Sequence, residues 1–379
     1  MQENREFLIP SDVGLDLYSN TMKSLSDRIE PNGFALTSVT GAYRGMFSRD
    51  CSIQVLAHIA NRQPENAFKI LNYTVNYHKQ YNMPHTVHIM GNSALDQPPI
   101  SLRVQVDGNY MFVNAYAIFA LEYLELYRQG IEDTFDTVLG FARYFFESRE
   151  HYKSEMSLLR NPCYEHGRES RYWECYDLMT NCYASQGCYN LSKVARALGR
   201  EGDAKLLGLY AARIEKGIHQ NLVTTHEGKD IYAELIAIDK GGEMVKGYSF
   251  VTFAPIACDW YALDEQRFAN TYEIFKRMGS TDFKGFDITS SYVTLDENDE
   301  FIHKQQYITG KGLAWEIWYC FKTGNTARAR HLLAFLDAFS VDCFDEGYFS
   351  DGRLRDTANQ EHASWIAYEF ARVCGLYNK

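Results

Sequence analysis

The feature that most constrains the fold of this chain is a regular alternation of short and long connections between its predicted helices. Apolar periodicity and capping residues divide the chain into twelve helical segments. Connections of two to five residues follow the second, fourth, sixth, eighth and tenth segments, whereas connections of about 20 to 30 residues follow the odd-numbered ones. The predicted helices span residues 15–29, 50–61, 65–80, 109–128, 134–147, 177–198, 203–221, 250–263, 266–278, 311–322, 326–339 and 360–376.

This alternation predicts how the helices are arranged in space. A short connection joins two helices into an antiparallel hairpin. Six hairpins whose long connections all lie at one end favour an all-α fold, a closed (α/α)6 toroid of twelve helices. The strand-like segments 248–253 and 300–308 are short and isolated. Because no Pro/Ser-rich linker divides the chain, we expect residues 1–379 to form a single barrel domain. The alternative is an open α-solenoid, but the self-similar repeats typical of solenoids are not evident in the sequence.

Local signals support several of the predicted helix ends. Asp264, Asn325 and the pair Asp133–Thr134 offer side-chain oxygens that can cap helix N-termini. Gly199 and Gly324 can adopt the left-handed conformation that commonly ends a helix. These signals place the short connections where the apolar periodicity also breaks.

Composition argues against several classes of function. The net charge of −11 argues against nucleic-acid binding, which usually needs a basic surface, and against attachment to an anionic membrane. No apolar run approaches the ~20 residues of a transmembrane helix, and the start of the chain lacks the pattern of a secretory signal. Nine scattered cysteines without a CxxC pair indicate reduced thiols, so we expect a cytoplasmic protein. Cys163 and His166 alone supply too few ligands for a structural zinc, so we expect no metal site.

The long connections carry residue types that suit a binding or catalytic site. Arg49 and Asp50 directly precede the apolar face of the second predicted helix. An Asp at a helix N-terminus is stabilised by the free backbone N–H groups, so we expect an ionised acceptor for hydroxyl groups, fixed further by the Arg. The other long connections add carboxylates, Arg, Gln and aromatic residues. Hydrolysis of a glycosidic bond needs two carboxyl groups, and aromatic faces stack on sugar rings, so this mixture favours a carbohydrate site.

Several ordered segments resemble the family 15 glycoside hydrolases, which are glucoamylase-like enzymes within the wider six-hairpin glycosidase superfamily. FSRD at 47–50 is similar to the family's W-x-R-D motif, and QVDGNY at 105–110 is similar to its Q-x-D-x-x-G segment. ESR at 169–171 resembles the segment W-E-x-R, whose Glu is the general acid. The ending at 344–371 resembles the family's closing segment, whose early Glu is the general base. Residues 308–336 match the helical hairpin that precedes this ending.

The resemblance implies roles for individual residues. Glu169 would be the general acid and Glu346 the general base, and Glu165 and Glu361 are the rival candidates for these two roles. Residues 165–173 also resemble the ESGxD segment of trehalase-like and mannosylglycerate-hydrolase-like relatives, and that alignment keeps Glu169 near the acid position. The residues that would hold the sugar or stack on it are Arg49, Asp50, Gln105, Asp107, Arg171, Trp173 and Tyr348.

These roles combine into one hypothesis of function. The resemblance implies an inverting, exo-acting glycoside hydrolase on short α-linked glucosides or related oligosaccharides. Its two carboxyl groups would lie about 6.5–9.5 Å apart, which leaves room for the attacking water. It would act on a small carbohydrate and need no organic cofactor. Three alternatives stay open: a sugar epimerase or isomerase that uses His residues, a non-catalytic sugar-binding protein on a decayed glycosidase scaffold, and a phosphorylase.

Overall fold

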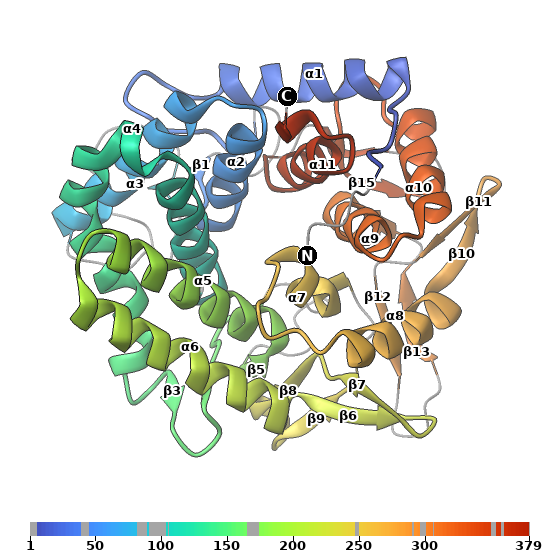
Figure 1. The fold of residues 1–379 in the computed structure, drawn as a ribbon. Helices are drawn as coiled ribbons and strands as arrows, with labels where there is room; N and C mark the ends of the chain where they lie inside the picture. Colours follow the sequence, from blue (N-terminus) through green and yellow to red (C-terminus); the bar gives the residue numbers. More distant parts are fainter. Residues whose placement is uncertain are drawn as a thin grey trace.

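The computed structural model describes most of the chain, and its helices and strands carry the labels of Figure 1. Among the residues described, no helix is both long enough and apolar enough to cross a membrane. The described residues are 6–38, 45–81, 89–90, 104, 106–164, 174–246, 250–289, 292–295, 301–305, 307–349, 354–357 and 360–378.

The described part of the chain is mostly helical, with eleven α-helices and three short 3-10 helices, η1 to η3. They are α1 (Asp12–Asp27), α2 (Ser48–Ala60), α3 (Pro64–Tyr81), α4 (Val106–Glu147), α5 (Leu178–Ala197), α6 (Glu201–Asn221), η1 (Ile238–Lys240), η2 (Phe250–Phe253), α7 (Ala254–Ala257), α8 (Glu265–Gly279), α9 (Gly310–Lys322), α10 (Thr326–Phe339), α11 (Gln360–Val373) and η3 (Leu376–Asn378).

The helices form a closed ring of two layers (Figure 1). In the inner layer α2 packs against α4, α4 against α5, α5 against α7, α7 against α9, α9 against α11, and α11 against α2. The outer helices α3, α6 and α10 each pack on the inner helix that precedes them, and α1 packs on α11. Because the last inner helix contacts the first, the ring closes. The predicted (α/α)6 toroid is therefore confirmed, and the open solenoid is excluded.

Helix α4 supplies two of the twelve predicted helices. Its backbone leaves helical geometry at Tyr123 and Tyr127, where the chain turns back on itself. The side-chain amide of Asn109 consequently donates to the carbonyl oxygen of Phe141, 3.1 Å away in the second half of α4. The two halves correspond to the predicted hairpin, but the turn lies at residues 123–127 instead of 129–133.

Most of the predicted helix ends have the expected caps. The side chains of Asp264 and Asn325 each accept a hydrogen bond from a backbone N–H in the first turn of the following helix. Gly199 and Gly324 have φ angles of 74° and 76°, as left-handed C-caps require. The prediction for Asp133–Thr134 is wrong, because α4 continues through these residues and leaves no N-terminus to cap.

The predicted helix at 250–263 is much shorter in the structure. Only four residues form α7, and the four before them form the 3-10 helix η2. The chain leaves the helix at Asp259, whose φ of 49° lies in the left-handed region. The N–H of Trp260 then donates to the carbonyl of Pro255 at 2.8 Å and closes the helix end. Asp259 therefore adopts the left-handed conformation that usually needs Gly, and it ends the helix earlier than apolar periodicity alone predicted.

Short strands occupy the long connections, and some of them pair neighbouring connections with one another. β1 pairs with β2, β5 with β8, and β14 with β15, each pair joining two successive connections. The strand-like segment predicted at 300–308 is therefore paired and not isolated, and 250–253 is helical. The strands are β1 (Gly45–Met46), β2 (Ile89–Met90), β3 (Tyr152–Lys153), β4 (Leu158–Leu159), β5 (Cys175–Asp177), β6 (Val223–His226), β7 (Lys229–Tyr232), β8 (Leu235–Ala237), β9 (Glu243–Val245), β10 (Ser280–Phe283), β11 (Phe286–Thr289), β12 (Tyr292–Leu295), β13 (Phe301–Gln305), β14 (Tyr307–Thr309), β15 (Asp345–Phe349) and β16 (Leu354–Thr357).

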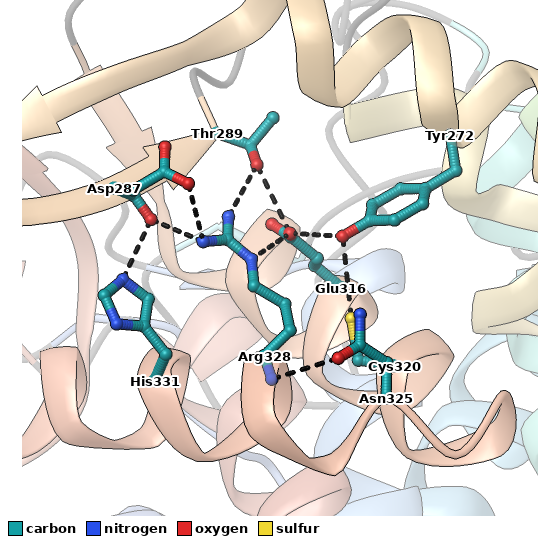
Figure 2. A network of polar contacts seen from close by, with 8 residues as sticks. All are labelled: Tyr272, Asp287, Thr289, Glu316, Cys320, Asn325, Arg328 and His331. Carbon is teal, nitrogen blue, oxygen red and sulfur yellow. Dashed lines mark hydrogen bonds and ion pairs between the residues drawn. The ribbon is translucent and has the colours of Figure 1, made fainter.

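A buried ion pair joins the inner and outer layers on one side of the ring. Arg328 of α10 donates through Nε to Glu316 of α9 at 2.9 Å, and both side chains are buried. Glu316 also accepts a hydrogen bond from Tyr272 of α8, and Arg328 donates to Thr289 of β11 (Figure 2). Because four elements meet at these two side chains, the pair fixes α8 and the β10–β11 hairpin to the α9–α10 hairpin.

Candidate functional site

The predicted site residues that the structure describes lie at one end of the inner helices. Arg49 and Asp50 are in the first turn of α2, Asp107 is in the first turn of α4, and Glu361 is in the first turn of α11. Glu346 lies on β15, which pairs with the strand that leads into α9. The face formed by the N-termini of the inner helices therefore gathers these residues. The predicted residues that lie outside the described part of the chain are Gln105, Glu165, Glu169, Arg171 and Trp173.

Arg49 and Asp107 form an ion pair between α2 and α4. The Nη1 atom of Arg49 lies 3.7 Å from Oδ2 of Asp107, and Asp107 is only 2% exposed. The next residue, Gly108, makes this approach possible, since a Cβ there would lie 2.3 Å from the hydroxyl of Ser48 in α2. The two predicted sugar-binding residues are thus brought together by a close contact between the first turns of their helices.

Asp50 is buried beside charged groups from three other positions. It occupies the third residue of α2, and the N-cap position is held by Phe47, whose side chain makes no capping hydrogen bond. Burial, and after it the carboxylate of Glu361, raise the pKa of Asp50 to about 8, although the charges of Arg49 and Lys311 act in the opposite direction. From the sequence alone, we expected Asp50 to be ionised. In the structure, desolvation outweighs the helix N-terminus and favours the protonated form near neutral pH.

A lysine that the sequence analysis missed belongs to the same face. Lys311 lies in the first turn of α9 and is only 4% exposed. Its ammonium donates to Glu361 at 2.8 Å, and its backbone N–H donates to Nδ1 of His362 at 3.3 Å. The signal in the sequence was a cation at the N-terminus of an apolar helix, where the helix dipole disfavours it. The rival base Glu361 is therefore held in a buried ion pair.

Glu346 is placed by strand pairing and by a close helix contact. It is 8% exposed. The preceding residue, Asp345, pairs with β16, and the following residue, Gly347, pairs with both β14 and β16. The first residue of α9, Gly310, lies so close to β15 that a Cβ there would be 2.4 Å from the carbonyl oxygen of Asp345. The candidate base is thus fixed against the first turn of the helix that carries Lys311.

Tyr348 does not stack at this face as the sequence analysis expected. Its side chain is 1% exposed, and its ring packs edge-on against Phe335 of α10 with centroids 5.2 Å apart. Its hydroxyl lies 2.8 Å from the hydroxyl of Ser340. The expectation for Tyr348 is corrected, because its ring fills the core between β15 and the outer helix α10.

A further buried carboxyl group, Asp177, lies at the N-terminus of α5. Its side chain caps the helix by accepting a hydrogen bond from the N–H of Thr180 at 2.6 Å. Burial raises the pKa of Asp177 to about 7, and the nearby carboxylate of Asp107 contributes to the rise. Carboxyl groups with raised pKa values near neutral pH can donate protons or hydrogen bonds, which suits acid–base chemistry and the binding of hydroxyl groups.

The described part of this face supplies carboxyl groups and two cations, but no cluster that could hold a metal ion. Groups of three or more His, Cys, Asp and Glu with suitable geometry are lacking among the described residues. The carboxyl groups of this face can transfer protons, and Arg49 and Lys311 can supply hydrogen bonds and ion pairs.

The ring of hairpins defines the structural class of this chain as an (α/α)6 toroid. No known protein family and no curated protein matches the chain by sequence. Solved structures do match it by shape. A bacterial glucoamylase complexed with acarbose superposes with a TM-score of 0.68 and 15% sequence identity. The match covers 94% of this chain and 54% of the glucoamylase chain, so the chain spans about half the length of that enzyme.

Two other similar structures match in length as well as in shape. A protein described as a glycosidase has a TM-score of 0.67 and 14% identity, with 96% of this chain and 97% of that chain covered. A GH63 mannosylglycerate hydrolase from Thermus thermophilus, in complex with Tris, also has a TM-score of 0.67 and 14% identity, with coverage of 94% and 99%. At these identities the likeness establishes the fold.

Proposed function

We propose that this protein is an inverting, exo-acting glycoside hydrolase of family 15 that cleaves short α-linked glucosides or related oligosaccharides. In this proposal Glu169 is the general acid and Glu346 is the general base. Residues 1–379 form one catalytic domain, which works in the cytoplasm on a small carbohydrate.

One observation carries the proposal. Glu346 is a nearly buried carboxyl group on β15, which packs on α9 and α11, the helices that carry the ion pair of Lys311 and Glu361. The solved structures of similar shape include a glucoamylase with acarbose and a glycosidase variant with glucose. A pair of carboxyl groups is the minimal machinery for hydrolysing a glycosidic bond, and a protein of this fold with a fixed carboxyl group at this face fits that chemistry.

The choice of Glu346 over Glu361 as the base is supported by the environment of Glu361. A general base must accept a proton from water, and a carboxylate that is ion-paired with an ammonium takes up a proton less readily. Glu361 lies 2.8 Å from the buried ammonium of Lys311. We therefore assign water activation to Glu346 and hydroxyl binding to Glu361.

The proposal is tested by following the first product by proton NMR on a panel of α- and β-linked disaccharides. The wild-type protein and the variant Glu346→Gln are compared under the same conditions. We expect the released sugar to appear first as the anomer opposite to that of the substrate, and Glu346→Gln to lose hydrolysis while keeping its circular dichroism spectrum.

Each other outcome contradicts a stated part of the proposal. Retention of the anomeric configuration would remove the water-activating role of Glu346. Isomerisation of a free monosaccharide would favour the epimerase alternative. A strict requirement for inorganic phosphate would replace hydrolysis by phosphorolysis. Binding without release of sugar from any member of the panel would favour the non-catalytic alternative.

A further inference from the structure

Helices α9 and α11 lie side by side in the inner ring (Figure 1). A seam of large side chains joins them. Residues spaced at i, i+4, i+7 and i+11 share one face of a helix. Three rungs connect the two faces: Lys311 with Glu361 at 2.8 Å, the rings of Trp315 and Trp365 at 5.2 Å, and the guanidinium of Arg372 over the ring of Trp318 at 3.5 Å. The stripes are Lys311, Trp315, Trp318 and Lys322 on α9, and Glu361, Trp365, Tyr368 and Arg372 on α11.

The two lysines of this seam occupy opposite electrostatic environments. Lys322 lies in the last turn of α9, where the helix dipole favours a cation, and its side chain is 31% exposed and 3.0 Å from Asp259. Lys311 lies in the first turn, where the dipole disfavours a cation, and it is almost fully buried. Burial of an ammonium is itself unfavourable, so the position of Lys311 depends on its partners.

Those partners come from three elements of the candidate site. The ammonium of Lys311 donates to Glu361 of α11 and lies 5.1 Å from the ring centroid of Phe250. Its charge also lowers the pKa of the buried Asp50 in α2, against the larger effect of burial. A lysine placed against both the dipole and burial is expected where function requires its charge. Packing of the seam does not require it, because the rung between Trp315 and Trp365 holds the helices together without charge.

We propose that Lys311 is a positioning residue of the site: its ammonium fixes Glu361 as an ionised acceptor for substrate hydroxyl groups and leaves the activation of water to Glu346. This inference rests on the proposed hydrolase function and adds to it the residue that holds Glu361 in its hydroxyl-binding role. It also implies that the charge of Lys311, and not only its volume, is needed.

The experiment compares Lys311→Met, Lys311→Arg and Glu361→Gln, with Lys322→Met as the matched control from the other end of the same helix. Kinetics are measured on the disaccharide that the panel identifies. A hydrogen bond from a substrate hydroxyl to a charged acceptor strengthens binding by about 10-fold or more, so we expect KM to rise by at least that factor in Lys311→Met and Glu361→Gln. Lys311→Arg recovers part of the loss because it restores the charge, and Lys322→Met leaves KM and kcat at the wild-type values.

Two kinetic outcomes would overturn the inference. Loss of kcat in Glu361→Gln together with full activity in Glu346→Gln would make Glu361 the base. Wild-type KM and kcat in Lys311→Met would remove Lys311 from the site.

A second readout does not depend on hydrolysis. The pKa of Asp50 is measured from the pH dependence of its carboxyl 13C resonance. The charges that act on this pKa are those of Glu361, Arg49 and Lys311. We expect Lys311→Met to raise the pKa of Asp50 above its wild-type value, because an attractive charge is removed, and Lys322→Met to leave it unchanged. An Asp50 shift without any hydrolysis of the panel would contradict the proposed function and leave the electrostatic role of Lys311 standing. An unshifted Asp50 in Lys311→Met would contradict the inference itself.

Discussion

Arg49 and Asp107 meet across the first turns of α2 and α4, with Nη1 of the arginine 3.7 Å from Oδ2 of the aspartate. The two residues belong to separate inner helices, and both side chains are largely withdrawn from solvent. An ion pair in such a position is strongly destabilising to break, because the remaining charge stays buried without its partner. The pair therefore stabilises the ring at the face formed by the N-termini of the inner helices, where the candidate site lies.

We predict that Arg49→Met lowers the free energy of unfolding by about 3–5 kcal/mol, because it leaves the buried Asp107 without the arginine. The double variant Arg49→Met with Asp107→Asn is expected to lose less than the sum of the single losses, since it removes both charges. Urea denaturation followed by circular dichroism gives these values. The exposed pair Arg143–Glu147 is the control, and its removal is expected to change stability by about 0.5 kcal/mol. Additive losses at Arg49 and Asp107 would contradict the coupling.

The ion pair between Glu316 and Arg328 should be equally sensitive, although it lies in the outer part of the ring (Figure 2). Arg328→Met removes hydrogen bonds to Glu316 and Thr289 together, so we expect a loss of about 3–5 kcal/mol in the free energy of unfolding. The surface pair Lys229–Glu273 serves as the control, and Lys229→Met is expected to change the free energy of unfolding far less. Equal losses in Arg328→Met and Lys229→Met would show that a buried ion pair contributes no more to stability here than an exposed one.

The buried carboxyl group of Glu369 should lower the free energy of unfolding as pH rises. Burial raises the pKa of Glu369 from 4.5 to about 8, against the attraction of Arg372. The folded protein therefore keeps this proton over a range in which the unfolded chain releases it. This contribution to stability is fully present below the pKa of Glu369 in the unfolded chain, and it is lost as pH rises through its pKa in the folded protein. We expect the free energy of unfolding to fall more steeply between about pH 5 and pH 8 in the wild type than in Glu369→Gln.

The control for this pH dependence is Glu147→Gln, which removes an exposed carboxylate from the surface of α4. It should leave the slope of stability against pH unchanged. Identical slopes for the wild type and Glu369→Gln would mean that the glutamate is ionised in the folded protein and that Arg372 outweighs burial.

Sequence reasoning predicted the fold well because the fold depends on features that are local in the chain. Helical periodicity, the caps at Asp264 and Asn325, and the lengths of the connections are sufficient to give a ring of hairpins. The error at 250–263 is also local in origin. A left-handed Asp259 ends α7 early, and nothing in the sequence distinguishes that Asp from one inside a helix.

The site was less predictable because burial and charge there depend on contacts between distant segments. The raised pKa of Asp50 follows from its burial and then from Glu361, which comes more than 300 residues later in the chain. Lys311 was missed because its importance depends on the same partner. Tyr348 was misassigned because strand alternation alone does not say that α10 covers its side. The order of the motifs predicted that Arg49 and Asp107 belong to one site, but it could not predict the pKa values of the carboxyl groups there.

The contact between Gly310 and β15 gives a final prediction, because it holds the first turn of α9 beside Glu346. A Cβ at residue 310 would lie 2.4 Å from the backbone oxygen of Asp345, which cannot move as a side chain can. We expect Gly310→Ala to lower the free energy of unfolding by about 1–3 kcal/mol and to reduce hydrolysis by displacing Lys311 from Glu361. The control is Gly208→Ala in α6, where nothing lies within 4 Å, and it should stabilise the protein by about 0.4–1 kcal/mol. Denaturation curves and kinetics of both variants are compared, and a Gly310→Ala variant as stable and as active as Gly208→Ala would contradict the close packing of α9 on β15.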